Sequence, residues 1–303
     1  MVWGVCNMDS ENKMIRMGFP PSLFIIGAQK SGTTFLADML SQHPLIQLAR
    51  QKEPGYYTRH FDKGLKWYEE CFPGNKESIL LDASTAYTMA PVGEHATRPV
   101  KNSKLLTNVP ERINDLSKDA RFIYILRCPV LRAYSAYWHN VRAGHEKCSL
   151  KEALQINSVY LRTSDYMAQL QEYLKVFPAD RIKIIIFEEA VKKPLETYKE
   201  CCRFIGIPDD LSPIIEKKNS SFVYVGVVQK LNQVLSPIGG LNPLVGMVSK
   251  LVPRGVLETF GRLITKKVPK ITESEYRYIE EKLHKTTKAL EEYLGRNIEV
   301  WHR

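Results

Sequence analysis

A short apolar run that leads directly into a glycine-bounded loop constrains this chain more than any other feature. Residues 23–26, Leu-Phe-Ile-Ile, are too few for a helix and predict a buried parallel strand, and a helical apolar pattern begins at Thr33. A tight loop between a strand end and a helix start directs backbone N–H groups and the positive end of the helix dipole at one point. Lys30 adds a full positive charge, and the serine and threonines of the loop add hydroxyl donors. The sequence therefore predicts an anion-binding loop close to the N-terminus.

The place of the lysine distinguishes this loop from a Walker A motif. Gly27 and Gly32 have the Walker spacing, but Lys30 lies between them and Thr33 follows the second glycine directly. The Walker motif instead has a lysine and a magnesium-binding Ser or Thr after its second glycine. We therefore expect a P-loop-like loop that binds a phosphate-type anion, with an ordinary strand-to-helix turn as the plainer alternative.

Short apolar runs alternate with helical patterns along most of the chain. The strands are expected at residues 23–27, 45–49, 78–81, 121–126 and 182–187. The helices are expected at residues 33–42, 130–141, 160–177, 195–205 and 273–293, the last of them capped by Thr272 and ended by Gly295. This alternation predicts an α/β fold of three layers, in which a parallel sheet has helices on both faces. Residues 1–21 are expected to form a polar leader, and residues 22–303 a single domain with a helical C-terminal part.

The charge and the cysteines narrow the class of protein only slightly. The chain of 303 residues has 43 Lys and Arg against 33 Asp and Glu, a net charge of +10 that favours anionic partners. Its six cysteines show no metal-ligand spacing, which is typical of reduced thiols in a cytosolic protein.

The N-terminus lacks the basic start and apolar core of an export signal. Residues 234–252 are apolar but interrupted by prolines and glycines, so we expect a core loop or a lid over an acceptor cleft, and no integral membrane segment.

Several short motifs resemble those of the sulfotransferases that use 3′-phosphoadenosine 5′-phosphosulfate (PAPS) as their donor. Besides the loop they are, in chain order, Ser41-Gln42-His43-Pro44, Lys52-Glu53-Pro54, Asp82-Ala83-Ser84-Thr85-Ala86-Tyr87, Phe122-Ile123-Tyr124-Ile125-Leu126-Arg127 and Glu292-Tyr293-Leu294-Gly295. The resemblance runs from Pro21 to the C-terminus and is strongest to the heparan-sulfate and bacterial branch of that family. It implies that the 5′-phosphosulfate is held by Gln29, Lys30, Ser31, Gly32, Thr33 and Thr34.

A second anion site is expected where the strand at residues 121–126 ends. Arg127 stands at the carboxyl end of that strand, where open α/β sheets bind ligands, and Ser135 follows on the next expected helix. The guanidinium offers a planar fork to a dianion, and the hydroxyl donates one more hydrogen bond. The resemblance implies that this pair holds the 3′-phosphate of the nucleotide. A surface ion pair is the alternative role for the arginine.

The resemblance also implies a general base and an aromatic residue beside the nucleotide. Glu53 matches the catalytic glutamate of the heparan-type branch, where a carboxylate would accept the proton of the attacking hydroxyl or amine. A solvated Lys-Glu pair is the alternative for this residue. Phe222 is expected to pack against the adenine. His43, before Pro44 at a helix end, is expected to have a structural role, and His60, His139 and His145 are weaker candidates for the base.

The expected activity is that of a PAPS-dependent sulfotransferase. Lys30 is expected to stabilise charge on the bridging oxygen as adenosine 3′,5′-bisphosphate (PAP) leaves. No metal is expected, because Lys30, Arg127 and backbone N–H groups supply the positive charge. Ala83 stands where some glycan enzymes have an assisting lysine, so we expect a small-molecule or saccharide acceptor, with heparan or chondroitin chains as the alternative.

Two other classes of function stay open. A P-loop nucleotide or small-molecule kinase would require Gly-Lys-[Ser/Thr] and a transferable γ-phosphate. A non-enzymatic binder of nucleic acid or another polyanion is suggested by charge alone, although we expect no nucleic-acid partner. The expected compartment is the cytoplasm, or the Golgi lumen if the chain is the catalytic domain of a membrane-anchored protein.

Overall fold

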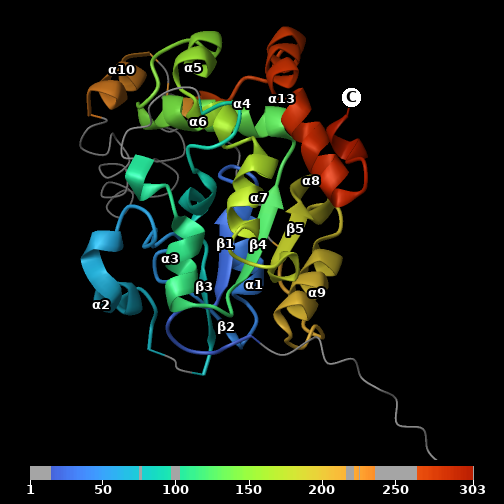
Figure 1. Cartoon of the computed structure of the whole chain (residues 1–303). Helices are drawn as coiled ribbons and strands as arrows, with labels where there is room; N and C mark the ends of the chain where they lie inside the picture. Colours follow the sequence, from blue (N-terminus) through green and yellow to red (C-terminus); the bar gives the residue numbers. More distant parts are fainter. Residues whose placement is uncertain are drawn as a thin grey trace, which may run out of the picture.

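The protein folds around a five-stranded parallel sheet with the strand order β2-β3-β1-β4-β5 (Figure 1). The computed structural model describes residues 15–74, 77–96, 103–215, 222–224, 226–235 and 265–302. The strands are β1 (Leu23–Gly27), β2 (Ile46–Leu48), β3 (Ile79–Asp82), β4 (Arg121–Leu126) and β5 (Ile182–Ile186). Every neighbouring pair is parallel, so the carboxyl ends of all five strands share one edge. The five expected strands are confirmed, with ends that shift by no more than one residue.

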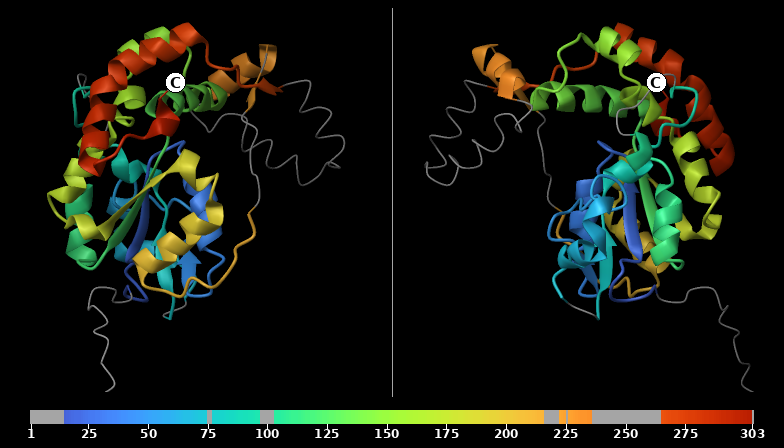
Figure 2. Two further views of the ribbon diagram at one scale, coloured as in Figure 1. Left: turned by 90° about the vertical axis from the view of Figure 1, so that its right-hand side faces the viewer. Right: turned by 60° about the vertical axis from the view of Figure 1, so that its left-hand side comes forward.

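Helices cover both faces of the sheet (Figure 2). Alternate residues of the central strands belong to two different hydrophobic cores. The helices of the two layers are α1 (Thr33–Leu40), α3 (Val109–Leu116), α7 (Tyr166–Leu174) and α9 (Pro194–Ile205), and α13 (Glu273–Leu294) packs against α7. Phe24 and Phe122 lie in one core together with residues of α3, α7 and α13. Ile25 and Ile123 lie in a second core together with residues of α1 and α9. The predicted three-layer α/β fold is therefore confirmed.

The end of the sheet where the strands finish is covered by α4 (Pro129–Ala143) and α13 (Figure 1). The side chain of Thr272 accepts a hydrogen bond from Glu275 N, and Gly295 ends α13 with a φ of 64°, as the sequence predicts. A small antiparallel ribbon pairs β6 (Phe222–Tyr224) with β7 (Thr265–Lys267). The sequence pattern did not predict five further helices: α2 (Gly64–Glu70), α3, α5 (Leu150–Ile156), α8 (Phe187–Ala190) and α10 (Gly226–Leu235).

The single helix expected at residues 160–177 is wrong, because the structure divides it into α6 (Val159–Arg162) and α7. The buried guanidinium of Arg132 donates to the Tyr160 carbonyl, which would otherwise accept a bond within a continuous helix, and to Ser164 Oγ at 2.6 Å. Asp165 then caps the new helix by accepting a hydrogen bond from Ala168 N at 3.3 Å. A long-range contact thus overrides the local apolar pattern.

The chain before the first strand runs along the domain from residue 15 onward. Ile15 is buried, and its N–H donates to Ile205 O at 3.3 Å. Arg16 forms an ion pair with Asp119 at 3.1 Å. Within the described ranges, no helix is both long enough and apolar enough to cross a bilayer. The rest of the expected leader, residues 1–14, and residues 236–252 of the expected lid lie outside the described residues.

Candidate active site

The loop between β1 and α1 has left-handed backbone conformations at two positions. Lys30 has a φ of 70°, and Gly32, the N-cap of α1, has a φ of 90°. No side chain caps this helix, so its amino end is left open to an anion. A carbon atom added to Gly32 would lie 2.3 Å from the Phe187 ring. Glycine is therefore required both by the backbone conformation and by the close approach of α8.

Gly32→Ala is expected to lower the free energy of unfolding more than Gly295→Ala does. Both glycines have a positive φ, 90° and 64°, and an L-residue there costs about 1–2 kcal/mol. A Cβ at Gly295 meets nothing within 4 Å, whereas a Cβ at Gly32 collides with Phe187 and adds about 1–3 kcal/mol. Urea denaturation of both variants measures the difference. Equal losses would contradict the close packing of the loop on α8.

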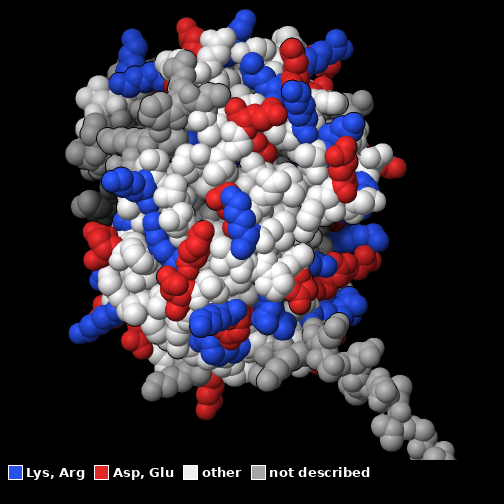
Figure 3. Space-filling model, viewed as in Figure 1, with Lys and Arg blue, Asp and Glu red and all other residues white. Residues whose placement is uncertain are grey.

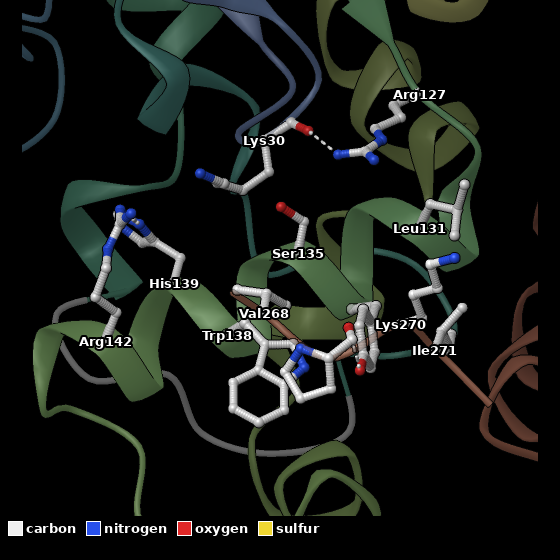
Figure 4. A pocket seen from close by; sticks show the side chains of 12 residues that line it. Lys30, Arg127, Leu131, Ser135, Trp138, His139, Arg142, Val268, Lys270 and Ile271 are labelled. Atoms are coloured by element: carbon white, nitrogen blue, oxygen red, sulfur yellow. Dashed lines mark hydrogen bonds between the residues drawn. The ribbon is translucent and has the colours of Figure 1, made fainter. Parts of the chain in front are cut away.

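Parallel pairing of β1 with β4 brings the second predicted anion site to this loop. Arg127 Nη1 donates to Lys30 O at 3.4 Å (Figure 4). The guanidinium also lies over the Phe187 ring, 5.7 Å from its centroid. Ser135 lies on α4 and borders the same cavity as Lys30 and Arg127 (Figure 4). The two anion sites expected from separate motifs are thus adjacent.

One cleft of about 980 Å³ collects most of the predicted site residues. They are Gln29, Lys30, Gly32, Thr33, Thr34, Glu53, Arg127 and Ser135. Ser31 belongs to the same loop, but its side chain is fully buried. Phe222 lies in β6 and its side chain is outside the described part of the structure, so its contact with adenine stays a prediction. A smaller hollow of about 360 Å³ shares Lys30, Arg127 and Ser135 and is bordered by residues 268–271.

Glu53 is tied both to the loop and to the segment that follows β3. Its Oε1 accepts from Lys52 Nζ at 2.9 Å, and the same ammonium donates to Thr33 Oγ1 at 3.0 Å. Its Oε2 accepts from Thr85 Oγ1 at 2.8 Å and from Thr85 N at 3.3 Å. The carboxylate is therefore held in one orientation beside the anion loop, while its side chain stays 33% exposed. A solvated Lys-Glu pair would lack these further contacts.

The electrostatics of the cleft favour a bound anion. The pKa of Lys30 is lowered from its ordinary value, first by burial and then by the positive charges of Arg142 and Arg127, with Glu53 acting in the opposite direction. A negative ligand would offset the repulsion between Lys30 and these two arginines. A nucleotide with a 5′-phosphosulfate and a 3′-phosphate fits this donor set, because it brings anionic groups to an open helix end and an arginine.

Two of the candidate histidines lie in different surroundings, His43 in the protein interior and His139 in the cleft. His43 is buried, with its Nδ1 accepting from Leu45 N at 3.1 Å and its Nε2 lying 3.2 Å from Pro208 O. His139 lines the cleft, and its Nδ1 accepts from Arg142 Nη2 at 3.1 Å, since a guanidinium can only donate. Burial, followed by the charges of Lys30 and Arg142, lowers the pKa of His139 to about 4. This histidine is therefore neutral at pH 7.

The structure adds residues that the sequence reasoning missed. The polar additions to the cleft and the adjoining hollow include Arg59, Thr85 and Arg142. The apolar additions to the cleft are Phe35, Met39, Phe187, Val191, Ile214 and Ile215. The spacing of Ser135, His139 and Arg142 along one face of α4 could have revealed the last of the polar set. Ile214 and Ile215 come from an irregular segment and have no such signal.

An anion-binding loop at the end of a parallel strand, joined by an arginine from the neighbouring strand, defines an α/β protein of the P-loop-like, nucleotide-binding class. The chain belongs to the sulfotransferase family, whose sequence model matches residues 21–211. The family resemblance expected from the motifs is therefore confirmed.

Individual relatives agree with this assignment. Heparan sulfate glucosamine 3-O-sulfotransferase 5 of Homo sapiens is 26% identical over 206 residues, which cover 63% of this chain and 55% of that protein. Heparan sulfate glucosamine 3-O-sulfotransferase 3B1 of Mus musculus is 27% identical over 197 residues, covering 62% of this chain and 46% of the relative. The chain thus spans about half the length of the curated relatives it matches. A sulfotransferase from Alicyclobacillus acidocaldarius has the same fold, with a TM-score of 0.66 at 22% identity and coverage of 93% of this chain and 99% of that one.

Proposed function

We propose that this chain transfers a sulfuryl group from PAPS to a hydroxyl or an amine. The observation that carries the proposal is the convergence of two cationic anion sites in one cleft with a carboxylate tethered to the first of them. In this proposal that carboxylate, Glu53, accepts the proton of the attacking acceptor.

Each part of the cleft has a role in this scheme. Residues 29–34 hold the 5′-phosphosulfate, and Arg127 and Ser135 hold the 3′-phosphate. Bound PAPS would supply an activated sulfuryl group. A new bond from sulfur to the acceptor forms as the bond from sulfur to the phosphate oxygen breaks, the acceptor proton passes to Glu53, and Lys30 stabilises the charge left on PAP.

The apolar wall of the cleft supports a nucleotide rather than inorganic phosphate. Phe35 follows the loop directly, and Phe187 lies against both Gly32 and Arg127. A purine needs apolar, preferably aromatic, surface next to the groups that hold its phosphates. We infer that part of this wall receives the adenine, together with Phe222.

For the acceptor we propose a small molecule or a saccharide. The names of the relatives make a glucosamine of heparan sulfate the alternative. Arg59 and Arg142 border the cleft and the adjoining hollow, and they suit an acceptor that carries acid groups. The cytoplasm stays the proposed compartment, with the Golgi lumen as the alternative.

The other classes make different predictions. A kinase would require magnesium, whereas we expect full transferase activity in EDTA because lysine and arginine face the anion. A polyanion binder would need an extended basic surface. On the face drawn in Figure 3, Lys and Arg side chains are interspersed with Asp and Glu, so no single basic patch dominates the described part of that face.

A transfer assay with ³⁵S-labelled PAPS tests the proposed function. The acceptor panel contains heparan sulfate, chondroitin, p-nitrophenyl glycosides and aryl amines, each in EDTA and in magnesium. We expect label on a small acceptor, with Lys175→Ala as a control because this lysine is exposed and pairs with Glu172. Label only on the glycan chains would overturn the small-acceptor preference. A strict requirement for magnesium would contradict the metal-free scheme.

A further inference from the structure

Asp82 is a carboxylate that is fully buried at the carboxyl end of β3. Three hydroxyl groups donate to it: Ser84 Oγ at 2.5 Å, Tyr68 OH at 2.8 Å and Tyr87 OH at 2.7 Å. Among the described residues it has no ion-pair partner, so its charge is offset by hydroxyl groups alone. Burial raises the pKa of Asp82 to about 6, and the three hydrogen bonds act against that rise. Burying an ionised carboxylate without an ion-pair partner costs free energy of folding, so we looked for a role of Asp82 other than packing.

The hydroxyl groups on Asp82 are bonded on their other side to the chain that carries Glu53. Ser84 Oγ accepts from Gly55 N at 2.8 Å, and Tyr87 OH accepts from Tyr57 N at 3.4 Å. A hydroxyl has one hydrogen to donate, and an ionised carboxylate can only accept. Because Asp82 takes the hydrogens of Ser84 and Tyr87, their lone pairs are left for the backbone N–H groups of residues 55–57.

The same two segments meet at Glu53 itself. Ala83 N donates to Lys52 O at 3.2 Å, immediately before the glutamate. Thr85 then binds Glu53 Oε2 through both its N–H and its hydroxyl. Residues 52–57 are thus fastened to residues 83–87 on both sides of the proposed base, and β2 beside β3 brings the two segments together.

We propose that Asp82 is a positioning residue for the reaction. By fixing which way the Ser84 and Tyr87 hydroxyls point, it holds the loop at residues 52–57 so that the Glu53 carboxylate faces the cleft. This inference rests on the proposed function, in which Glu53 is the base. It assigns Asp82 no contact with PAPS or with the acceptor.

Ser84→Ala and Tyr68→Phe form a matched pair of variants that tests the relay, by which we mean the hydrogen-bonded link from Asp82 through Ser84 to the Gly55 backbone. Each removes one hydroxyl from Asp82, but only Ser84 passes a hydrogen bond on to the loop backbone. The assay uses labelled PAPS and an acceptor from the panel above that the wild-type protein sulfates. We expect turnover to fall about 10- to 100-fold in Ser84→Ala, the scale of a misplaced catalytic group. The KM for PAPS should stay within about twofold. Tyr68→Phe should lose thermal stability but keep wild-type turnover.

A measurement without an acceptor checks the geometry independently. Amide hydrogen exchange at Gly55 should become faster in Ser84→Ala and stay slow in Tyr68→Phe. Unchanged exchange at Gly55, or equal losses of turnover in the two variants, would overturn the relay.

A double-mutant cycle separates this inference from the proposed function. If Ser84 acts through Glu53, the effect of Ser84→Ala on turnover should disappear in the Glu53→Gln background. An undiminished effect there would show that Ser84 acts elsewhere and would overturn the positioning role, with the base assignment intact. Wild-type turnover in Glu53→Gln alone would instead remove the base from the proposed function. Asp82→Asn should resemble Ser84→Ala, because an amide nitrogen forces at least one hydroxyl to turn round.

Discussion

Glu53→Gln is expected to lower turnover by about 10²-fold or more while the affinity for PAP stays near normal. Glutamine keeps the size of the side chain and can still accept from Thr85, but it cannot take up a proton. Glu53 is hydrogen-bonded to the anion loop through Lys52, and its negative charge is not one of the groups that hold the anionic nucleotide. Steady-state turnover with labelled PAPS and calorimetric titration with PAP measure the two quantities separately.

His139→Gln is the control for this prediction, because the neutral imidazole of His139 is a second possible proton acceptor in the cleft. Its pKa of about 4 makes it a weak base, and its Nδ1 is occupied by Arg142. We expect a smaller loss of turnover than in Glu53→Gln. Wild-type turnover in Glu53→Gln, with an acceptor whose chemistry limits the rate, combined with a large loss in His139→Gln, would transfer the role of base to the histidine.

Lys30→Ala is expected to lower turnover by about 10²- to 10³-fold, the scale of losing one preorganised donor to a developing charge. Affinity for PAP should fall much less, because Arg127 and the open end of α1 still hold the anionic groups. The reason is that charge on the bridging oxygen grows as the sulfuryl group leaves, so Lys30 acts most strongly in the transition state.

The Lys30 prediction is checked by comparing turnover with PAP affinity in the same variant. Lys175→Ala removes an equal charge from a surface helix end and should change neither quantity. A parallel loss of turnover and affinity in Lys30→Ala would mean that the lysine only binds the nucleotide.

The sheet and the anion loop could be predicted from local sequence, because their signals are local. A short apolar run with glycine and lysine behind it specifies a strand, a turn and a helix start without any partner. The adjacency of Arg127 to Lys30 also follows once both strands are parallel members of one sheet. The division of the helix at residues 160–177 could not be predicted, since it depends on Arg132, a distant buried residue.

The hydrogen-bond partners of Glu53 could not be predicted from the sequence either, because they also depend on contacts between distant segments. Its contacts with Thr85, and the link from Asp82 through Ser84 to Gly55, arise only because β2 lies beside β3. The Asp-Ala-Ser-Thr-Ala-Tyr motif could be recognised as a family resemblance, but no pattern in the sequence predicts the hydrogen bonds that its side chains form. The apolar wall formed by Ile214 and Ile215 likewise lies in a segment without periodicity.

Calorimetric titration with PAP, AMP and ATP–magnesium tests the central claim most directly, namely that the cleft holds a 3′-phosphorylated adenine nucleotide. PAP should bind at least about 10-fold more tightly than AMP, since charged hydrogen bonds from Arg127 and Ser135 contribute about 1.5–3 kcal/mol. Arg127→Ala should remove most of that difference, and ATP–magnesium should show no advantage. Equal affinity of the wild-type protein for PAP and AMP would contradict the account.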